Sequence, residues 1–337
     1  MNRREVLKVS CGAALAAAGL GSRALADSSA AGSAPALKMS ETMKNLDKAV
    51  RLLFDEYMRD PSICLGPDGT YYLTGTTTGQ NCIRLWRSPD LGRWEKLDFE
   101  WRYGASPWHH PYQAAGRPLW APEVHYKKGT FWLTYSMPTY TGAFKDSGSG
   151  LLRSTTGRAE GPYVDVSPNE RLGDEIDASL FEDEDGAIYF VWHCGKIRRM
   201  KPDMSGPAEP GRRLTIAVPD PDPMHHSDLC PKIHGPNSFD HVGYEGAFLL
   251  KVNDTYLLTV SDHYDGKYSC WAATSKNIYG PYSARYPAIP YGGHNMFFQD
   301  KANRWWSTIF NGPVFEKPAI LPVAIAANGQ ISLRTGE

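Results

Sequence analysis

The feature that most constrains how this chain can fold is a hairpin-like pattern that occurs five times within its 337 residues. Each copy has a short apolar run, a polar turn and a second run of aromatic or β-branched residues, which is typical of a β-hairpin. The copies begin at Asp60, Trp120, Asp177, Glu245 and His294. Aligned without gaps, their turn positions are Gly69, Gly129, Gly186, Asp254 and Asn303. Gly, Asn and Asp tolerate the positive φ angles that such turns require.

Further strand-like segments follow most of these hairpins, and the copies start 49 to 68 residues apart. Two hairpins per repeat give a four-stranded unit, and a repeat of this size is typical of a β-propeller blade. We therefore predict an all-β fold, a five-bladed β-propeller over residues 57–337. Residues 40–58 have helical periodicity instead and are predicted to form a short N-terminal helical arm. The apolar face of this arm would consist of Met43, Leu46, Val50 and Leu53.

The N-terminal residues 1–26 resemble a twin-arginine export signal. Arg3 and Arg4 precede an apolar, alanine-rich stretch, and small residues suited to cleavage end at Ala26. The stretch is too short to favour a membrane span. We therefore expect a periplasmic or secreted protein with no membrane span, in which residues 27–56 form a linker and the helical arm.

Cysteine spacing indicates free thiols. Cys11 lies within the predicted signal, which leaves an odd number of widely spaced cysteines with no CxxC pair. An odd number excludes complete intramolecular pairing. We expect mostly buried free thiols and no thiolate zinc site. The cysteines concerned are Cys64, Cys82, Cys194, Cys230 and Cys270.

The composition bears on possible partners. A formal net charge of −1 gives no electrostatic footprint for nucleic acid. The chain has 18 Tyr and 10 Trp, whose flat apolar faces and polar groups suit sugar rings as well as ordinary sheet packing. Nothing in the sequence indicates the oligomeric state.

The first residues of the five hairpins should meet in space. The innermost strands of a propeller surround a central channel, so equivalent positions on them form a ring at one mouth of that channel. Such a ring would here contain three carboxylates, from Asp60, Asp177 and Glu245, with Trp120 and His294. Three acids in one ring repel one another, which favours a functional role over a structural one.

Paired carboxylates across a pocket are the groups that hydrolyse glycosidic bonds. An inverting enzyme needs an ionised base to activate water and a protonated acid for the leaving oxygen. A third carboxylate nearby raises the pKa of the acid by like-charge repulsion. Spacing along the chain does not decide which acid takes which part.

Five motifs in the chain resemble the successive blade motifs of glycoside hydrolase family 43. They are "RDPSI" at 59–63, "WAPEV" at 120–124, "EIDASLFEDEDG" at 175–186, "YEGAFLLK" at 244–251 and "GGHNMFFQD" at 292–300. The resemblance implies an inverting, exo-acting hydrolase of arabinose- or xylose-type or related plant or algal oligosaccharides or polysaccharides. It implies Asp60 as the base, Asp177 as the pKa modulator and Glu245 as the acid. It also implies that His294 contacts a structural calcium ion in the channel, directly or through the water shell of the ion, with no cofactor required for the chemistry.

Two departures from that family open an alternative. Glu123 stands where the family usually has Asp, and "IFNGPVFEKP" after the last inner hairpin lacks the family's usual arginine. Glycoside hydrolase family 117, which releases 3,6-anhydro-L-galactose from agar oligosaccharides, shares the propeller, and its proposed acid is a histidine. His241 in "HVGYEG" would suit that role. A sugar-binding propeller without catalysis is a further alternative, but it would have no need for the complete set of three acids.

Two loops are predicted to form walls of the pocket. The loop at 101–120 precedes Trp120, and its Trp108 and His110 are expected to contact sugar together with Trp120, Glu123 and His241. The loop at 219–242 precedes Glu245, is stiffened by proline and contains four histidines. The spacing of these histidines matches no established metal motif.

Overall fold

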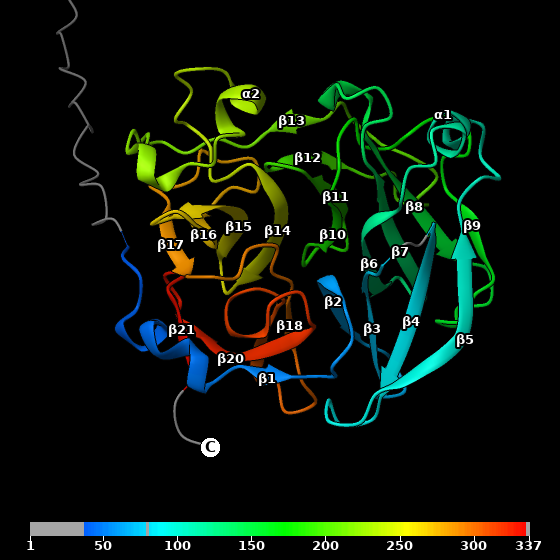
Figure 1. Ribbon diagram of the computed structural model, residues 1–337, viewed down its shortest axis with the longest axis horizontal. Helices are drawn as coiled ribbons and strands as arrows, with labels where there is room; N and C mark the ends of the chain where they lie inside the picture. Colours follow the sequence, from blue (N-terminus) through cyan, green and yellow to red (C-terminus); the bar gives the residue numbers. More distant parts are fainter. Residues whose placement is uncertain (1–36, 79–80, 335–337) are drawn as a thin grey trace, which may run out of the picture. The chain divides into compact units, whose positions relative to one another are not determined.

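Five antiparallel sheets make up most of the computed structural model, which describes residues 37–78 and 81–334. Figure 1 shows the sheets arranged around a common centre, where their first strands meet. These first strands are β2 (Arg59–Leu65), β6 (Trp120–Lys127), β10 (Ala178–Glu182), β14 (Glu245–Val252) and β18 (Phe297–Gln299). The arrangement is a five-bladed β-propeller, so the predicted fold is confirmed. The predicted export signal at 1–26 lies outside the described residues.

Four blades are built from consecutive strands, each paired with the next. Blade one continues with β3 (Tyr71–Thr76), β4 (Cys82–Ser88) and β5 (Glu95–Arg102). Blade two continues with β7 (Thr130–Met137), β8 (Gly148–Ser154) and β9 (Tyr163–Asp165). Blade three continues with β11 (Ile188–Trp192), β12 (Lys196–Arg199) and β13 (Arg212–Arg213). Blade four continues with β15 (Thr255–Tyr264), β16 (Lys267–Ser275) and β17 (Tyr286–Ile289).

Blade five is completed by a strand from the other end of the chain. Its order is β18, β19 (Trp305–Ile309), β20 (Ala319–Ile325) and then β1 (Arg51–Leu52), while β21 (Ile331–Leu333) also pairs with β20. Arg51 pairs with Ile320 and Leu52 with Ala319. This pairing ties the two ends of the described chain together and satisfies an otherwise open sheet edge.

The predicted helical arm is shorter than its periodicity indicates. The 3₁₀ helix η1 (Glu41–Lys48) buries Met43 and Leu46 against blade five, as expected for one apolar face. The segment that contains Val50 and Leu53 does not continue the helix, because the backbone of the adjoining residues 51–52 pairs with β20 instead. Tertiary pairing thus overrides local helical periodicity.

The remaining helices are single short turns in the loops. They lie in connections that leave the sheets at the end where β2 and β14 begin. They are η2 (Pro107–His109), α1 (His110–Ala114), η3 (Phe144–Asp146), η4 (Pro223–His225), α2 (Cys230–His234) and η5 (Gly312–Val314). Among the described residues, none of the helices has the length and apolar character needed to cross a membrane.

The core lies between neighbouring blades. Trp192 of blade three packs with Trp132 and Leu151 of blade two, and Trp271 of blade four packs with Val191 of blade three. Many Trp and Tyr residues therefore serve packing between the sheets. None of the five cysteines of the described residues forms a disulfide, and four of them are buried, as predicted.

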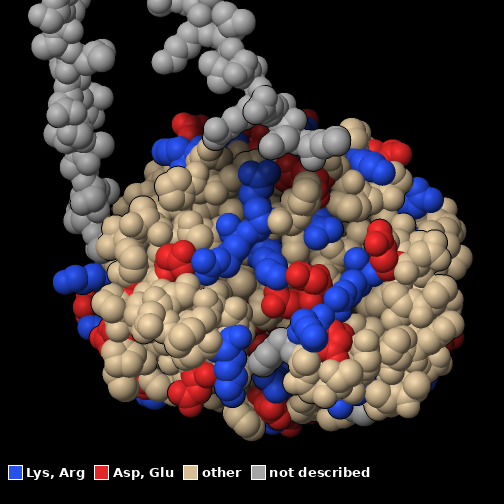
Figure 2. Space-filling view, turned by 90° about the horizontal axis from the view of Figure 1, so that it is seen from above, with Lys and Arg blue, Asp and Glu red and all other residues tan. Residues whose placement is uncertain are grey.

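The edge of blade three carries charges of both signs. Figure 2 shows Lys and Arg side chains crossing this face with Asp and Glu side chains beside them. On β13, Arg212 lies 3.6 Å from Glu209 and Arg213 lies 3.0 Å from Asp240. The basic residues of this outer strand are thus paired with acids.

Candidate active site

The first strand of each blade starts with a residue in the left-handed backbone region. Asp60, Asp177 and His294 have φ angles of 51°, 62° and 56°, while Ala121 and Gly246 have 42° and 66°. In blades one, two and four the strand pairing shifts register at this point, as in a β-bulge. Left-handed backbone at residues other than glycine costs about 1–3 kcal/mol each, so the surroundings must hold it in place.

The gapless alignment of the five hairpins is wrong by one residue in blades two and four. Their hairpin connections have two residues, 128–129 and 253–254, whereas the other three connections, 66–70, 183–187 and 300–304, have five. As a result, Trp120 pairs with Ser136 and Glu245 pairs with Ser261. These pairings are equivalent to that of Arg59 with Thr76 in blade one. The structural counterparts of Asp60 are therefore Ala121 and Gly246, and Trp120 and Glu245 lie one residue earlier than predicted.

Hydroxyl groups of one blade hold the first strand of the next. Thr76 accepts the N–H of Ala121 at 2.7 Å, Ser136 accepts that of Asp177 at 2.7 Å, and Ser261 accepts that of His294 at 2.5 Å. In blade three, His193 occupies the position that Thr76, Ser136 and Ser261 occupy in their blades. The carbonyl of His193 accepts the N–H of Ala247 at 3.0 Å. These bonds fix the left-handed residues, so the side chains at the channel mouth are held in place before any ligand binds.

Two of the three predicted acids meet His294. Its Nδ1 lies 3.3 Å from Asp60 Oδ1 and 3.9 Å from Asp177 Oδ2. Glu245 joins them through its neighbour, because the N–H of Gly246 donates to Asp177 Oδ2 at 3.2 Å. The side chains of Asp60 and Asp177 are 11% and 4% exposed. The structure therefore brings Asp60, Asp177, Glu245 and His294 together.

Hydrogen bonds orient two of these carboxylates. Thr76 donates to Asp60 Oδ2 at 2.8 Å, and Tyr268 donates to Glu245 Oε1 at 3.0 Å. Burial raises the pKa of Tyr268, and the nearby Glu245 raises it further. Tyr268 therefore remains a hydrogen-bond donor to Glu245 over the working pH range.

The site raises the pKa of its buried groups. Burial raises the pKa of Asp177 to about 7, with His294 opposing this shift and Glu245 and Asp60 adding to it. Burial also raises the pKa of Glu245, with His294 opposing and Asp60 adding. For His294, burial alone would lower the pKa, but Asp60, Asp177 and Glu245 raise it overall. A cluster with these shifts can keep one carboxyl group protonated near neutral pH.

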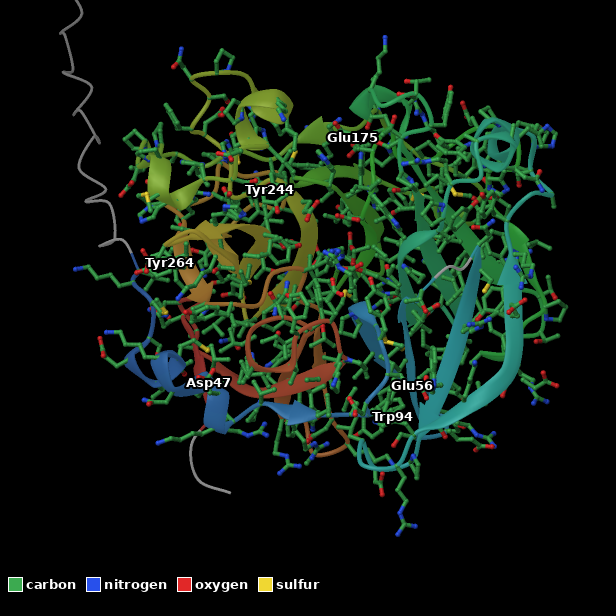
Figure 3. All side chains as sticks on the ribbon, viewed as in Figure 1. Asp47, Glu56, Trp94, Glu175, Tyr244 and Tyr264 are labelled. Carbon is green, nitrogen blue, oxygen red and sulfur yellow. The ribbon has the colours of Figure 1, made fainter. Side chains whose placement is uncertain are left out.

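Sequence reasoning did not identify His193, although it is the last residue of the third hairpin motif. Its Nδ1 lies 3.1 Å from Glu175 Oε2, which in turn lies 2.6 Å from Lys196 Nζ. Figure 3 labels Glu175 in blade three. Burial opposes protonation of His193, but contacts with Cys194 and Glu175 raise its pKa to about 10. The positive charge of His193 in turn lowers the pKa of Asp177 and Glu245.

The segment after the last inner hairpin has no arginine of its own, but an arginine from blade one lies beside it. Arg59 directly precedes Asp60, and its guanidinium lies 5.3 Å from the ring centre of Phe310 and 3.9 Å from Glu316. Both partners belong to the segment after the last inner hairpin. Its side chain is 42% exposed, and the neighbouring Tyr57 is 36% exposed. Arg59 and Tyr57 were missed because a motif search treats each blade separately.

The five predicted sugar contacts have different outcomes. His241 is fully buried, with its ring stacked on His234 at 3.8 Å, so the prediction that it contacts sugar is wrong. Trp108 is half-buried, packs on His109 at 4.4 Å and directs its N–H to Asp165, and its contact with sugar remains a prediction.

The other three remain predictions. Trp120 is 38% exposed, which leaves part of its ring available for stacking, and His110 is exposed at the start of α1. Glu123 is 4% exposed and lies 2.9 Å from His125, yet its charge contributes to the raised pKa of His294.

A calcium ion bound directly by His294 Nδ1 does not fit this geometry. That nitrogen already faces two carboxylates, and calcium needs six to eight oxygen ligands. Within residues 37–78 and 81–334, the one group of His, Cys, Asp and Glu side chains with metal-like spacing lies elsewhere. An ion contacted by His294 only through water stays a prediction.

Gly246→Ala tests how closely the backbone holds Glu245. A Cβ on Gly246 would lie 3.0 Å from His294 Cγ and from Ser261 Oγ, at a φ of +66°. We expect a loss of about 1–2 kcal/mol in stability from the left-handed backbone, plus a further loss from these contacts and reduced turnover. The matched control is Gly266→Ala in the same blade, where φ is +70° but no heavy atom lies within 4 Å. Equal stability losses with unchanged turnover in both variants would contradict this account.

A comparison with protein-family models matches residues 54–317 to Glycosyl hydrolases family 43. Among curated proteins, the chain is 29% identical over 231 residues to "Xylosidase/arabinosidase 43B" of Humicola insolens, covering 66% of this chain and 39% of that protein. It is 24% identical over 303 residues to "Putative beta-xylosidase" of Escherichia coli (strain K12), covering 81% and 51%. The chain thus spans about half the length of these relatives or less.

Solved structures agree on the fold. An endo-arabinase from Bacteroides thetaiotaomicron VPI-5482 superposes with a TM-score of 0.63 at 22% identity, covering 80% of this chain and 95% of that one. An exo-1,5-α-L-arabinanase from a bovine ruminal metagenomic library superposes with a TM-score of 0.63 at 19% identity, covering 84% and 99%. At this level of identity the likeness concerns the propeller itself.

Proposed function

The chain belongs to family 43 of the glycosyl hydrolases, and we propose that it is an exported, inverting, exo-acting hydrolase of arabinose- or xylose-containing oligosaccharides. The observation that carries this proposal is the cluster of Asp60, Asp177 and Glu245 around His294. Export to the periplasm or beyond rests on the sequence of residues 1–26. Exo action and the sugar type rest on relatives named as β-xylosidases and as an exo-α-(1→5)-L-arabinofuranosidase.

In the proposed reaction, Asp60 is the base and Glu245 is the acid. Asp60 takes a proton from water, and the water oxygen attacks the anomeric carbon as the glycosidic C–O bond breaks. Glu245 gives its proton to the leaving oxygen, so the products are a free sugar and an alcohol. Thr76 and Tyr268 orient the two carboxylates through the hydrogen bonds described above.

Asp177 keeps Glu245 protonated in this scheme. Of the three acids only Asp177 is buried, and this burial raises its pKa to about 7. Once Asp177 ionises, its charge opposes ionisation of Glu245, which is the acid that must hold a proton. His294, whose pKa is raised by the three acids, supplies a positive charge beside Asp60, the proposed base.

Exposed groups at the mouth suit a sugar. Trp120 and Tyr57 present aromatic faces, and Arg59 supplies hydrogen-bond donors for hydroxyl groups. A calcium ion contacted by His294 through water is part of the proposal as a structural feature. No step of the reaction uses it.

Neither alternative is favoured. The agar-directed alternative depended on His241 as an acid, and that side chain is fully buried. A sugar-binding propeller without catalysis would gain nothing from a cluster of three acids in which the pKa values of Asp177 and Glu245 are raised.

A panel of substrates tests the proposal. Aryl arabinosides and xylosides, arabino- and xylo-oligosaccharides, and agar-derived oligosaccharides would be incubated with the purified full chain. We expect release of terminal arabinose or xylose, with proton NMR of the first product showing inverted anomeric configuration. Hydrolysis of agar oligosaccharides alone would support the family 117 activity. Binding without hydrolysis of any substrate would support the non-catalytic alternative, and a retained anomer would contradict the assignment of Asp60 as a base.

A further inference from the structure

Four side chains with metal-binding groups converge beneath the loop at 219–242, which we call the wall loop. His226, Cys230 and His241 come from this loop, and Asp262 comes from β15 of blade four. One ligand atom from each lies within 4.8 Å of the other three. The side chains of His241 and Asp262 are 0% exposed, that of His226 is 7% exposed, and Cys230 is 4% exposed. The cluster plays no part in the reaction proposed above.

Four of the six separations between these atoms fit a tetrahedron around one small ion, and the other two, from Cys230 Sγ to the two histidine nitrogens, are at most 4.8 Å. His226 Nδ1 lies 3.2 Å from His241 Nε2 and 3.4 Å from Asp262 Oδ2. Asp262 Oδ2 lies 3.8 Å from His241 Nε2 and 3.5 Å from Cys230 Sγ. Four ligands about 2.0–2.3 Å from a tetrahedral zinc ion are separated from one another by about 3.3–3.8 Å.

Hydrogen bonds set the position of the proton on His226 and the orientation of Asp262, while Arg285 Nη2 lies 3.1 Å from His226 Nδ1. His226 Nε2 donates to the carbonyl of Asp220 at 2.6 Å, so its Nδ1 carries no proton when the ring is neutral. This outer hydrogen bond is the usual partner of a metal-binding histidine. Asp262 Oδ1 accepts the N–H groups of Ser227 and His263 at 2.7 and 2.9 Å, which leaves Oδ2 facing the cluster.

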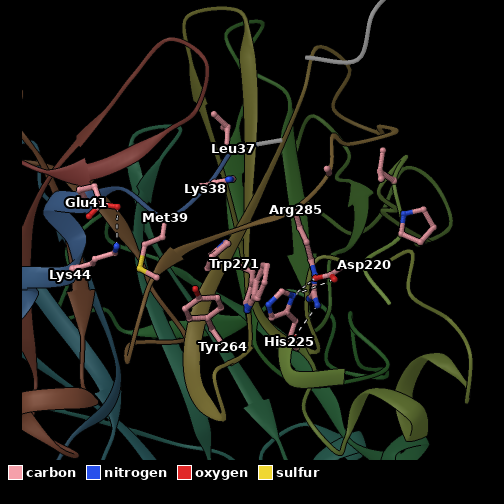
Figure 4. Close-up of a pocket in the computed structure, with 14 residues that line it drawn as sticks. Leu37, Lys38, Met39, Glu41, Lys44, Asp220, His225, Tyr264, Trp271 and Arg285 are labelled. Atoms are coloured by element: carbon pink, nitrogen blue, oxygen red, sulfur yellow. Dashed lines mark hydrogen bonds and ion pairs between the residues drawn. The ribbon is translucent and has the colours of Figure 1, made fainter. Parts of the chain in front are cut away.

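Arg285 borders the cluster on its outer side. Its guanidinium lies 2.7 Å from Asp262 Oδ2, 3.0 Å from Asp220 Oδ2 and 4.2 Å from the ring centre of Trp271. Figure 4 shows Arg285 beside Asp220 and His225 at the wall of a pocket of about 480 Å³. This pocket reaches Arg285, and none of the four clustered side chains lines it.

The charges balance when a divalent ion is added. A divalent ion and Arg285 together carry three positive charges. A Cys230 thiolate, Asp262 and Asp220 carry three negative charges. Without an ion, Arg285 faces two carboxylates alone. Asp262 Oδ2 has one lone pair for the guanidinium and one for the metal, whereas His226 Nδ1 has only one, so an ion would have to replace the contact of Arg285 Nη2 with that nitrogen.

Contrary to the expectation from cysteine spacing, we propose that His226, Cys230, His241 and Asp262 form a zinc site. Two imidazoles, one thiolate and one carboxylate in tetrahedral arrangement are ligands that zinc prefers over calcium or magnesium. All four positions are filled by protein, which is the pattern of a structural site. Binding replaces the S–H bond of Cys230 with an S–Zn bond and releases the proton to solvent.

The site would fasten the wall loop to blade four. Three ligands lie in the loop, and the fourth lies on β15, the strand that pairs with β14. His241 is four residues before Glu245, so the bound ion would also fix the entry into the strand that carries the proposed acid.

Metal content and cobalt spectroscopy test this site without reference to activity. The purified full chain would be analysed for metals after dialysis, and chelator-treated protein would be reloaded with Zn²⁺ or Co²⁺ alone. We expect about one zinc per chain, release of protons on loading and a rise in Tm of several degrees. The cobalt form should show a near-ultraviolet thiolate-to-metal charge-transfer band together with the visible bands of a tetrahedral ion.

Two variants locate the ion. Cys230→Ser is expected to lose the thiolate band, and His241→Gln is expected to lose metal retention and the Tm response to Zn²⁺. Cys64→Ser removes a free thiol in blade one and is expected to behave as the unmodified chain. Absence of stoichiometric Zn²⁺ and of any cobalt spectrum in the unmodified chain would overturn the proposal. Retention of the thiolate band in Cys230→Ser would overturn the ligand assignment.

Discussion

Asp60→Asn and Glu245→Gln are each expected to lose nearly all turnover while keeping the fold. Each variant removes one partner of the proposed acid–base pair, which is worth about 10²–10⁴-fold in rate. The substituted amides keep the shape of the side chains, and each can still accept the hydrogen bond from Thr76 or Tyr268. Initial rates on the best substrate of the panel, with circular dichroism and Tm as checks of folding, measure the effect.

The leaving group separates the two roles. An aryl glycoside with a very acidic phenol needs little protonation of its leaving oxygen, so Glu245→Gln should recover much of its rate on such a substrate. Asp60→Asn should not recover, because water still lacks its base. Asp68→Asn and Glu184→Gln are matched controls, since both residues lie in hairpin connections at the other end of their blades. Near-normal rates for either site variant would contradict the assigned roles.

Asp177→Asn is expected to stabilise the protein at pH 8 while slowing it. Burial raises the pKa of Asp177 to about 7, above the value of about 4 expected in the unfolded chain. Between these two values the folded state holds a proton that the unfolded state has released, so stability falls as pH rises through this window. The full penalty is present above pH 7, and Asn removes it. Three pKa units correspond to at most ~4 kcal/mol.

Denaturant unfolding at pH 4 and pH 8 measures this effect. The gain should be large at pH 8 and nearly absent at pH 4, where Asp177 is protonated in the folded state. Asp183→Asn, at the opposite end of β10, is a control of opposite sign. Burial raises the pKa of Asp183, but hydrogen bonds from Tyr256 and Lys251 outweigh burial and lower the pKa overall. Removing this carboxylate should therefore destabilise the protein at pH 8. A less stable Asp177→Asn protein at pH 8 would show that the carboxylate is a net stabilising group.

The same variant should also move the pH–rate profile. Without the charge of Asp177, Glu245 loses its proton at lower pH, so the basic limb of kcat/KM should shift to lower pH. A slower enzyme with an unchanged basic limb would indicate that Asp177 only positions neighbouring groups.

The sequence alone determined the blades and the identity of the acids. A hairpin depends on alternating side chains and on turn residues, which are local properties, so five copies could be counted and assembled into a propeller. Asp60, Asp177 and Glu245 could be selected because three carboxylates at equivalent positions of the hairpins would converge and repel one another, which favours a function. His294 was placed beside them by the same reasoning, and the structure brings it within 3.3 Å of Asp60.

Tertiary structure alone decided which residues occupy equivalent positions. Trp120 and Glu245 lie one residue earlier than the gapless alignment indicates, because two hairpins have shorter connections. Such an offset is invisible in sequence, since either connection length is compatible with Gly or Asn in the turn. Arg59 was likewise missed, because its contact with Phe310 joins residues about 250 positions apart.

Local sequence patterns also could not predict how the ring of blades closes or that the wall loop buries its side chains. Residues 51–52 have helical periodicity in their neighbourhood, yet they form a strand because β20 offers an open edge. The proximity of His241 to Glu245 in the sequence predicts a pocket residue. The wall loop instead buries His241 beside three other side chains, those of His226, Cys230 and Asp262. Periodicity and turn chemistry report which face of an element is buried. They do not report which distant side chains that face will meet, because this depends on how the blades and loops pack around one another.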